Sequence, residues 1–157
     1  MSDAAQAYYA RRLQSDMRLV HLMHEAGVRL LAGSDSLDPW VLPGDSLHHE
    51  LEMLVKAGLS PMEALQAATV RPAEFFAFEN ELGTVTKGKR ADLVLLDANP
   101  LENISNTRKI AAVIQAGRYM VPADLLKNAD ELRNLMNVTS TQTSGIRPQS
   151  VAAPAAP

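Results

Sequence analysis

A single carboxylate follows an apolar run near the start of the chain, and it is the residue best placed to do chemistry. Residues 28–32 are nearly all aliphatic, which is typical of a strand buried on both faces of a parallel sheet. Gly33 and Ser34 allow the chain to turn, so Asp35 stands just past the carboxyl end of that strand. Reactive groups collect at this end of the strands in parallel α/β folds. The sequence therefore points to part of an α/β enzyme with Asp35 as its leading chemical residue.

The loop that follows carries further side chains able to contact a ligand. Ser36, Asp38 and Trp40 come directly after Asp35, where a loop following a strand would cover an active site and shape the substrate pocket. Ordinary turn chemistry at Asp38-Pro39 explains the same residues equally well. Asp35 itself has an alternative role as a cap for the next turn. Both interpretations of the loop stay open on the sequence.

The four histidines occur as two pairs that resemble metal-binding arrangements. His48 and His49 are adjacent, so on a helix they point about 100° apart and do not easily bind one ion. One of them facing the site remains an alternative. His21 and His24 are three residues apart and share a helix face, which permits joint coordination. That helix would lie outside the sheet, away from the strand ends, so we expect roles other than metal binding for both pairs.

Helices on either side of the apolar run are the elements that would position Asp35. Apolar residues at steps of three and four predict a helix from Ser2 or Asp3 to about residue 25. A second helix is predicted from Asp45 or the next residue. The segment Ser60-Pro61-Met62-Glu63 is a capping box with proline at the first helical position, so it predicts the start of a third helix.

Turn signals become denser after residue 83, and they predict short β-strands. Residues 93–96 form one strand in this interpretation. Residues 112–115 and 119–121 flank Ala116-Gly117, which is typical of a tight hairpin turn. The composition changes again toward the end of the sequence, where few apolar groups are available to offset the entropy of ordering.

Composition excludes several classes of protein. The chain has 157 residues, of which 46% are hydrophobic, so one ordinary core is available. A net charge of −3 provides no large basic field for nucleic acid. No apolar stretch reaches the roughly 18–20 residues of a membrane span. The absence of cysteine excludes disulfides and thiolate metal sites. It is compatible with the cytoplasm, which we favour, although a signal peptide encoded upstream would change that expectation.

Five sequence words at characteristic order and spacing closely resemble the C-terminal portion of the amidohydrolase superfamily, the metal-dependent hydrolases related to imidazolonepropionase and prolidase-like dipeptidases. The words are AGVRLLAGSD, GDSLHHEL, VKAGLSPMEALQAAT, LGTVTKGKRADLVLLD and VIQAGR. Together they extend from Ala26 to about Met120. The basic turn within the fourth word, at residues 87–90, belongs to a structural β-segment in that family rather than to an anion site.

The resemblance implies an α/β fold that is one part of a (β/α)8 barrel followed by part of a small β-sandwich. Residues 1–80 would be the last helix–strand–helix units of the barrel, and residues 81–121 the sandwich segment. A C-terminal helix over 122–136 and a disordered tail over 137–157 would follow. A closed barrel needs about 250 residues. We therefore interpret the chain as a fragment, a truncated gene product or one piece of a split enzyme, whose partner is the missing N-terminal barrel segment.

The resemblance also implies a reaction. Asp35 matches the aspartate that, in this family, binds a divalent metal and takes the proton of the attacking water. A carboxylate suits both tasks, since it is a hard ligand and a bound metal lowers the pKa of water toward neutrality. Zinc is the expected metal, and a small-molecule amide, cyclic amide or peptide-like compound is the expected substrate. The family's His-x-His motif and its other ligands are not in this sequence, so we expect the isolated chain to be inactive.

A non-catalytic role is the alternative. The same scaffold would then serve as an interaction module that pairs through an exposed barrel edge with another chain or with copies of itself. Unpaired strand edges favour such association.

Overall fold

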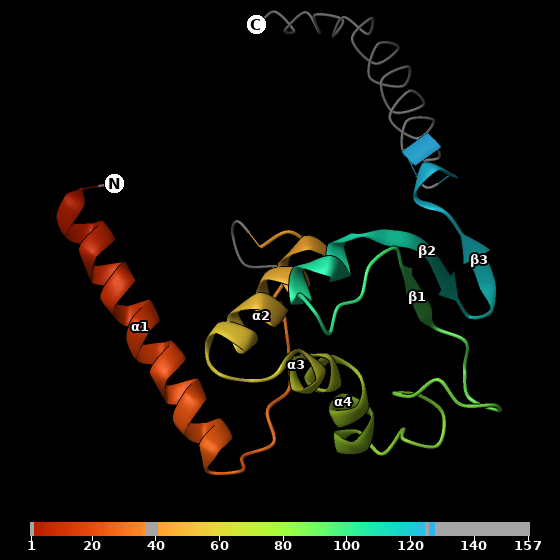
Figure 1. Ribbon diagram of the computed structural model, residues 1–157, viewed down its shortest axis with the longest axis horizontal. Coiled ribbons are helices and arrows are strands. Elements are labelled where there is room, and N and C mark those ends of the chain that lie inside the picture. The colour runs from red at the N-terminus through yellow and green to blue at the C-terminus, as the bar shows by residue number, and fades with distance from the viewer. Residues whose placement is uncertain (1, 37–40, 125, 128–157) are drawn as a thin grey trace, which may run out of the picture. The chain divides into compact units, whose positions relative to one another are not determined.

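The computed structural model describes residues 2–36, 41–124 and 126–127 of the chain. The residues up to Met120 belong to one compact unit, which contains the helices and strands named below (Figure 1). A second unit begins at Val121, and in it residues 122–124 and 126–127 are helical. The remainder of the helix predicted over 122–136, and the tail predicted over 137–157, lie outside the described residues.

The first helix, α1 (Asp3–Glu25), confirms the helix predicted at the start of the chain. The Ser2 hydroxyl accepts a hydrogen bond from the first turn, as an N-cap residue does. At the other end Gly27 adopts a φ of 75°, and the Val28 N–H donates to the Met23 carbonyl at 2.9 Å. This pattern is a Schellman motif, which turns the chain away from the helix axis and starts the extended segment that follows.

Three further α-helices and one 3-10 helix pack into a helical layer. They are α2 (Asp45–Lys56), α3 (Pro61–Ala68), α4 (Val70–Phe75) and η1 (Ile104–Arg108). The predicted start of α2 is confirmed. The predicted capping box is also confirmed, because the Ser60 hydroxyl accepts from the Glu63 N–H while the Glu63 carboxylate accepts from the Ser60 N–H.

The core lies between α2, α3 and η1. Its buried side chains are Leu51, Leu54, Leu59, Ala64, Ala67 and Ile104, and Val20, Leu30 and Ala32 pack against them partly buried. The helix α1 contains no buried residue, so it contributes only its inner edge to this core. The extended segment after α1 is therefore held by the core rather than by α1.

The strand predicted over residues 28–32 does not form, and that prediction was wrong for this chain. The segment is extended but is not part of a β-ladder. Its Ala32 N–H donates instead to the Ala67 carbonyl at 2.9 Å, at the end of α3. A parallel strand needs a neighbouring strand for its backbone hydrogen bonds. Leu30 and Ala32 are partly buried, whereas Val28 and Leu31 are 43% and 38% exposed, so the predicted burial on both faces is not observed either. The apolar pattern carries no information on whether a partner strand is present.

The predicted strands after residue 83 are confirmed as one antiparallel sheet in the order β1 (Leu93–Leu96), β2 (Ile110–Gln115) and β3 (Arg118–Met120). Ala116 and Gly117 both have positive φ, 49° and 81°, which is the two-residue I′ turn that suits a right-handed strand twist. Within the described residues this is a single three-stranded sheet, so the predicted sandwich is not confirmed.

Candidate functional site

Asp35 lies in the turn that follows the extended segment. Its φ of 48° is in the left-handed region, which aspartate adopts more readily than most residues. The side chain is exposed to solvent, whereas Ala32, three residues earlier, is partly buried against the core. The fold thus places an exposed carboxylate on a turn whose base is held by the Ala32 hydrogen bond.

The other residues predicted for this loop are only partly described. Ser36 follows Asp35 in the turn and is half-buried. Asp38 and Trp40 lie outside the described residues. Their assignment to substrate contact therefore stays a prediction, as does that of Ser36.

Glu50 of α2 is the residue near this turn that sequence reasoning missed. Its carboxylate lies near the backbone of Gly33, two residues before Asp35, and burial raises the pKa of Glu50 above its ordinary value. The sequence signal was its position directly before Leu51, which is buried.

The two histidines of α2 have partners of their own. The Thr107 hydroxyl donates to the Ile104 carbonyl at 2.8 Å, so at 3.0 Å its oxygen accepts from Nδ1 of His48. Burial lowers the pKa of His48, so its imidazole favours the neutral form. His49 instead lies 3.5 Å from Asp45 on its own helix. Neither ring is directed to Asp35 by these contacts.

The two histidines of α1 also diverge. Nδ1 of His21 lies 3.0 Å from the Ala57 carbonyl, which is a hydrogen bond with the ring as donor. Nε2 of His24 lies 3.7 Å from Oε1 of Glu63. Although His21 and His24 are on one face of the helix, they contact different elements. In these contacts the two imidazole rings share no partner.

This turn offers one side chain suited to binding a metal ion, that of Asp35. Across residues 2–36, 41–124 and 126–127, no group of three or more His, Cys, Asp or Glu side chains is arranged to hold a metal ion. A catalytic zinc typically takes about three protein ligands. The described residues fit a metal centre only as the source of a single carboxylate, that of Asp35. They do not form such a centre by themselves.

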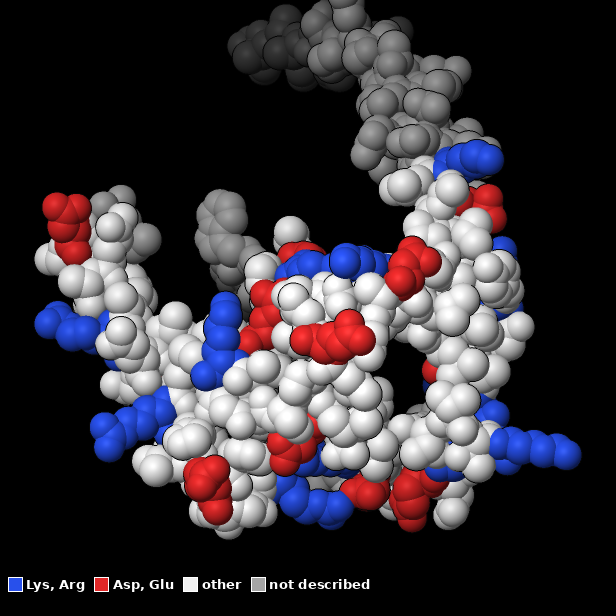
Figure 2. Space-filling model, viewed as in Figure 1, with Lys and Arg blue, Asp and Glu red and all other residues white. Residues whose placement is uncertain are grey.

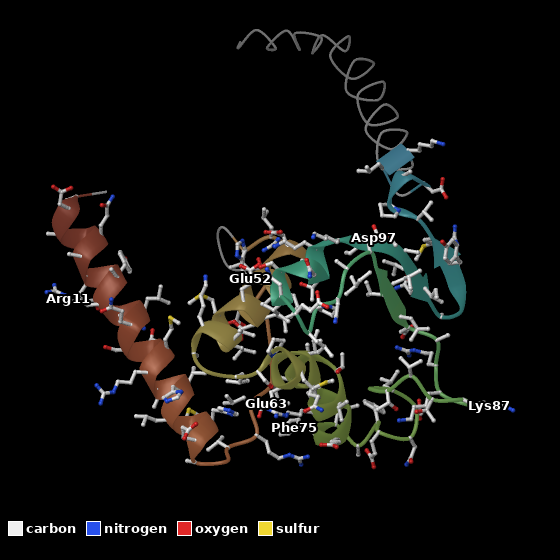
Figure 3. The ribbon with its side chains drawn as sticks, in the orientation of Figure 1. Arg11, Glu52, Glu63, Phe75, Lys87 and Asp97 are labelled. Carbon is white, nitrogen blue, oxygen red and sulfur yellow. The ribbon has the colours of Figure 1, made fainter. Side chains whose placement is uncertain are left out.

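An arginine fixes the helix that carries Glu50. Arg108 of η1 forms ion pairs with Asp45 and Glu52 of α2, with 3.2 Å between its Nε and Oε1 of Glu52. Figure 3 labels Glu52 on α2. Together with the His48–Thr107 hydrogen bond, these contacts join residues more than 50 positions apart in sequence.

On the face of the molecule shown in Figure 2, basic and acidic side chains are interspersed. No helix in the described part of the chain combines the length and apolarity needed to span a membrane.

Comparison with known proteins identifies the family. The sequence pattern described as "Amidohydrolase family" matches residues 6–120, which includes Asp35 and every element from α2 to β3. This chain belongs to the amidohydrolase family. The resemblance inferred from the five sequence words is therefore confirmed, and the match also includes most of α1.

The similar proteins are named as different enzymes. The chain is 35% identical over 78 residues to an adenine deaminase from Clostridium botulinum (strain Loch Maree / Type A3), covering 49% of this chain and 13% of that protein. It is 36% identical over 88 residues to an imidazolonepropionase from Rubrobacter xylanophilus, covering 51% and 21%. A solved Xaa-Pro dipeptidase with bound methionine in the active site is 30% identical with a TM-score of 0.60, covering 67% and 25%. The chain thus spans a quarter or less of these three amidohydrolases.

Proposed function

We propose that this chain provides the C-terminal part of a metal-dependent hydrolase that cleaves a carbon–nitrogen bond in a small-molecule amide, cyclic amide or peptide-like compound. The observation that supports it is the exposed carboxylate of Asp35, presented on a fixed turn of a chain that belongs to the amidohydrolase family. The similar proteins include an adenine deaminase and an imidazolonepropionase. Residues 1–80 would then belong to the barrel and residues 81–121 to the sandwich segment.

In this proposal Asp35 binds the metal and accepts a proton. A divalent metal, with zinc as the first choice, would supply a Lewis acid that lowers the pKa of water. The carboxylate of Asp35 is free to turn toward that water because it is exposed and its turn is held through Ala32. Glu50 would help to keep the turn in place, because its carboxylate lies near the Gly33 backbone. Ser36, Asp38 and Trp40 would contact the substrate.

The remaining metal ligands would come from a separate segment of the barrel. In the described part of the chain, the N–H groups of Val28 and Ala32 and the carbonyl of Leu30 are the backbone groups of residues 28–32 with hydrogen bonds, so the others are available to a neighbouring strand. A complementary N-terminal barrel segment would pair there and bring its own ligands beside Asp35. The chain alone would hold metal weakly and turn over little substrate.

The test compares turnover by the chain alone, by the full-length protein and by a full-length variant that lacks the Asp35 carboxylate. The chain is assayed for hydrolysis of a panel that includes adenine and proline-terminated dipeptides, first alone with zinc and then as part of the full-length protein. We expect no turnover by the chain alone and clear turnover by the full-length protein. Asp35→Asn in the full-length protein should reduce the rate by about three orders of magnitude or more. Asp16→Asn, at an exposed carboxylate of α1, is the matched control and should leave the rate unchanged.

A second candidate is a non-catalytic interaction module, and exposed apolar side chains favour it. Phe75 and Phe76 are 71% and 62% exposed, with ring centroids 5.0 Å apart at the end of α4 (Figure 3). Exposed aromatic pairs of this kind are typical of surfaces that bind a partner. Near-normal turnover by the Asp35→Asn variant would contradict the catalytic role of Asp35. If the full-length protein shows no turnover and the chain binds a partner through Phe75 and Phe76, the interaction module becomes the better account.

A further inference from the structure

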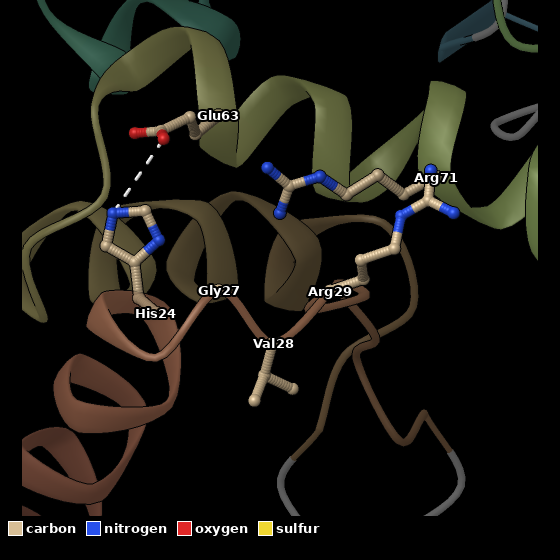
Figure 4. Close-up of a pocket in the computed structure, with 6 residues that line it drawn as sticks. All are labelled: His24, Gly27, Val28, Arg29, Glu63 and Arg71. Atoms are coloured by element: carbon tan, nitrogen blue, oxygen red, sulfur yellow. Dashed lines mark ion pairs between the residues drawn. The ribbon is translucent and has the colours of Figure 1, made fainter.

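A pocket separate from the Asp35 turn lies where the end of α1 meets α3 and α4. It has a volume of about 410 Å³ and is lined by His24, Gly27, Val28, Arg29, Glu63 and Arg71 (Figure 4). None of these residues belongs to the loop predicted to contact substrate. The pocket is therefore a feature that the proposed hydrolase reaction does not use.

Arg71 brings to this pocket a positive charge that lacks a carboxylate partner within the described residues. Arg108, which is partly buried like Arg71, has two such partners. Arg71 has one hydrogen bond, from Nη1 to the Leu30 carbonyl at 3.5 Å. A guanidinium carries several N–H donors, so most of those of Arg71 remain available. In Figure 4 its guanidinium extends toward His24 and Glu63, across the pocket.

The carboxylates around the pocket are already engaged. Oε2 of Glu63 accepts from the Ser60 N–H at 2.8 Å and from the Ser60 hydroxyl at 2.7 Å. Oε1 of Glu63 faces Nε2 of His24 at 3.7 Å. Arg29, the second arginine of the lining, forms its ion pair with Glu74. These local pairs leave most N–H donors of Arg71 for a group from outside the chain, while the nearby Glu63 carboxylate offsets part of its charge.

We propose that this pocket binds a small molecule through an oxyanion, a carboxylate or a phosphate group, held by the guanidinium of Arg71. The planar fork of donors in arginine matches the oxygen spacing of both groups and binds them in pairs of hydrogen bonds. The volume is within the range of about 300–1,000 Å³ that is usual for small-molecule sites. The ligand is a second molecule, distinct from the substrate assigned to the Asp35 turn, and its binding does not depend on hydrolase activity.

Calorimetric titration of the whole chain tests this site. Inorganic phosphate and acetate are titrated separately, and we expect saturable binding of at least one with a Kd on the order of 1 mM. Tighter binding of phosphate would assign a phosphorylated ligand, and tighter binding of acetate a carboxylate. Arg71→Gln should weaken binding about tenfold, because the paired hydrogen bonds are lost. Arg12→Gln removes an exposed α1 arginine that lies outside the pocket and pairs with Asp16, so it should change binding less than about twofold.

A second variant keeps the proposal testable if Arg71→Gln does not fold. Glu63→Gln preserves the capping box, since glutamine serves at that position, but removes the negative charge that faces the ligand. Binding of the anion should become several-fold tighter, roughly threefold to tenfold. Circular dichroism confirms the fold of each variant. The absence of saturable binding of both anions, or equal binding by the original chain and a folded Arg71→Gln variant, would overturn the assignment.

Discussion

Replacement of Gly58 by alanine should destabilise the chain through two separate effects. Gly58 ends α2 with a φ of 115°, a conformation in which a side chain is strained. That strain costs about 1–2 kcal/mol. A Cβ at this position would also lie 2.6 Å from Nδ1 of His21, so the ring must move and its hydrogen bond to the Ala57 carbonyl is lost. The hydrogen bond contributes about 1 kcal/mol. The expected loss in free energy of unfolding is therefore about 2–3 kcal/mol.

Urea denaturation followed by circular dichroism measures this loss against a matched control. Gly88 has a φ of 95° and nothing within 4 Å of an added Cβ, so Gly88→Ala should show the backbone strain alone, about 1–2 kcal/mol. In the Gly58→Ala background, His21→Ala should cost less than it does in the original chain, because the hydrogen bond is already broken. Equal destabilisation by Gly58→Ala and Gly88→Ala, together with additive effects of the Gly58 and His21 substitutions, would refute the contact between α1 and the end of α2.

Two further substitutions address the capping box and the buried histidine. Ser60→Ala removes the side-chain acceptor at the start of α3 and should lower the free energy of unfolding by about 1 kcal/mol. Ser15→Ala, at an exposed position in the interior of α1, is the control and should change it little, so equal losses in urea denaturation would contradict the cap. Burial lowers the pKa of His48, so the unfolded chain binds a proton more readily, and the stability it contributes is present above about pH 6.5 and is lost as the pH falls below that value. His48→Gln should flatten the fall in melting temperature between about pH 7 and pH 5, and an unchanged slope would show that this ring does not control it.

Local signals predicted several helix ends and the hairpin correctly, whereas the predicted barrel strand did not form and the predicted sandwich is not confirmed. The Ser60–Glu63 box, the end of α1 near Gly27 and the Ala116-Gly117 hairpin each depend on a few adjacent residues, and each formed where predicted. The segment 28–32 failed because a strand depends on a neighbour that the local sequence does not specify. The contact of His48 with Thr107 joins positions 59 residues apart, so spacing along one helix gives no sign of it.

The candidate site was less predictable than the fold. Asp35 could be selected because it follows an apolar run at a Gly-Ser turn. Glu50 could not, because its role depends on the side of α2 that faces the Gly33 backbone. The pocket of Arg71 was equally hidden, since its lining comes from α1, the following loop, α3 and α4.

One carboxylate both closes the first turn of α3 and forms a wall of the Arg71 pocket. Hydrogen bonds from Ser60 lower the pKa of Glu63, so that group stays ionised in mildly acidic solution and continues to serve both neighbours. Helix stability and anion affinity are consequently linked through Glu63. Acidification strong enough to protonate it would fray the helix start and at the same time remove a charge that repels an incoming anion.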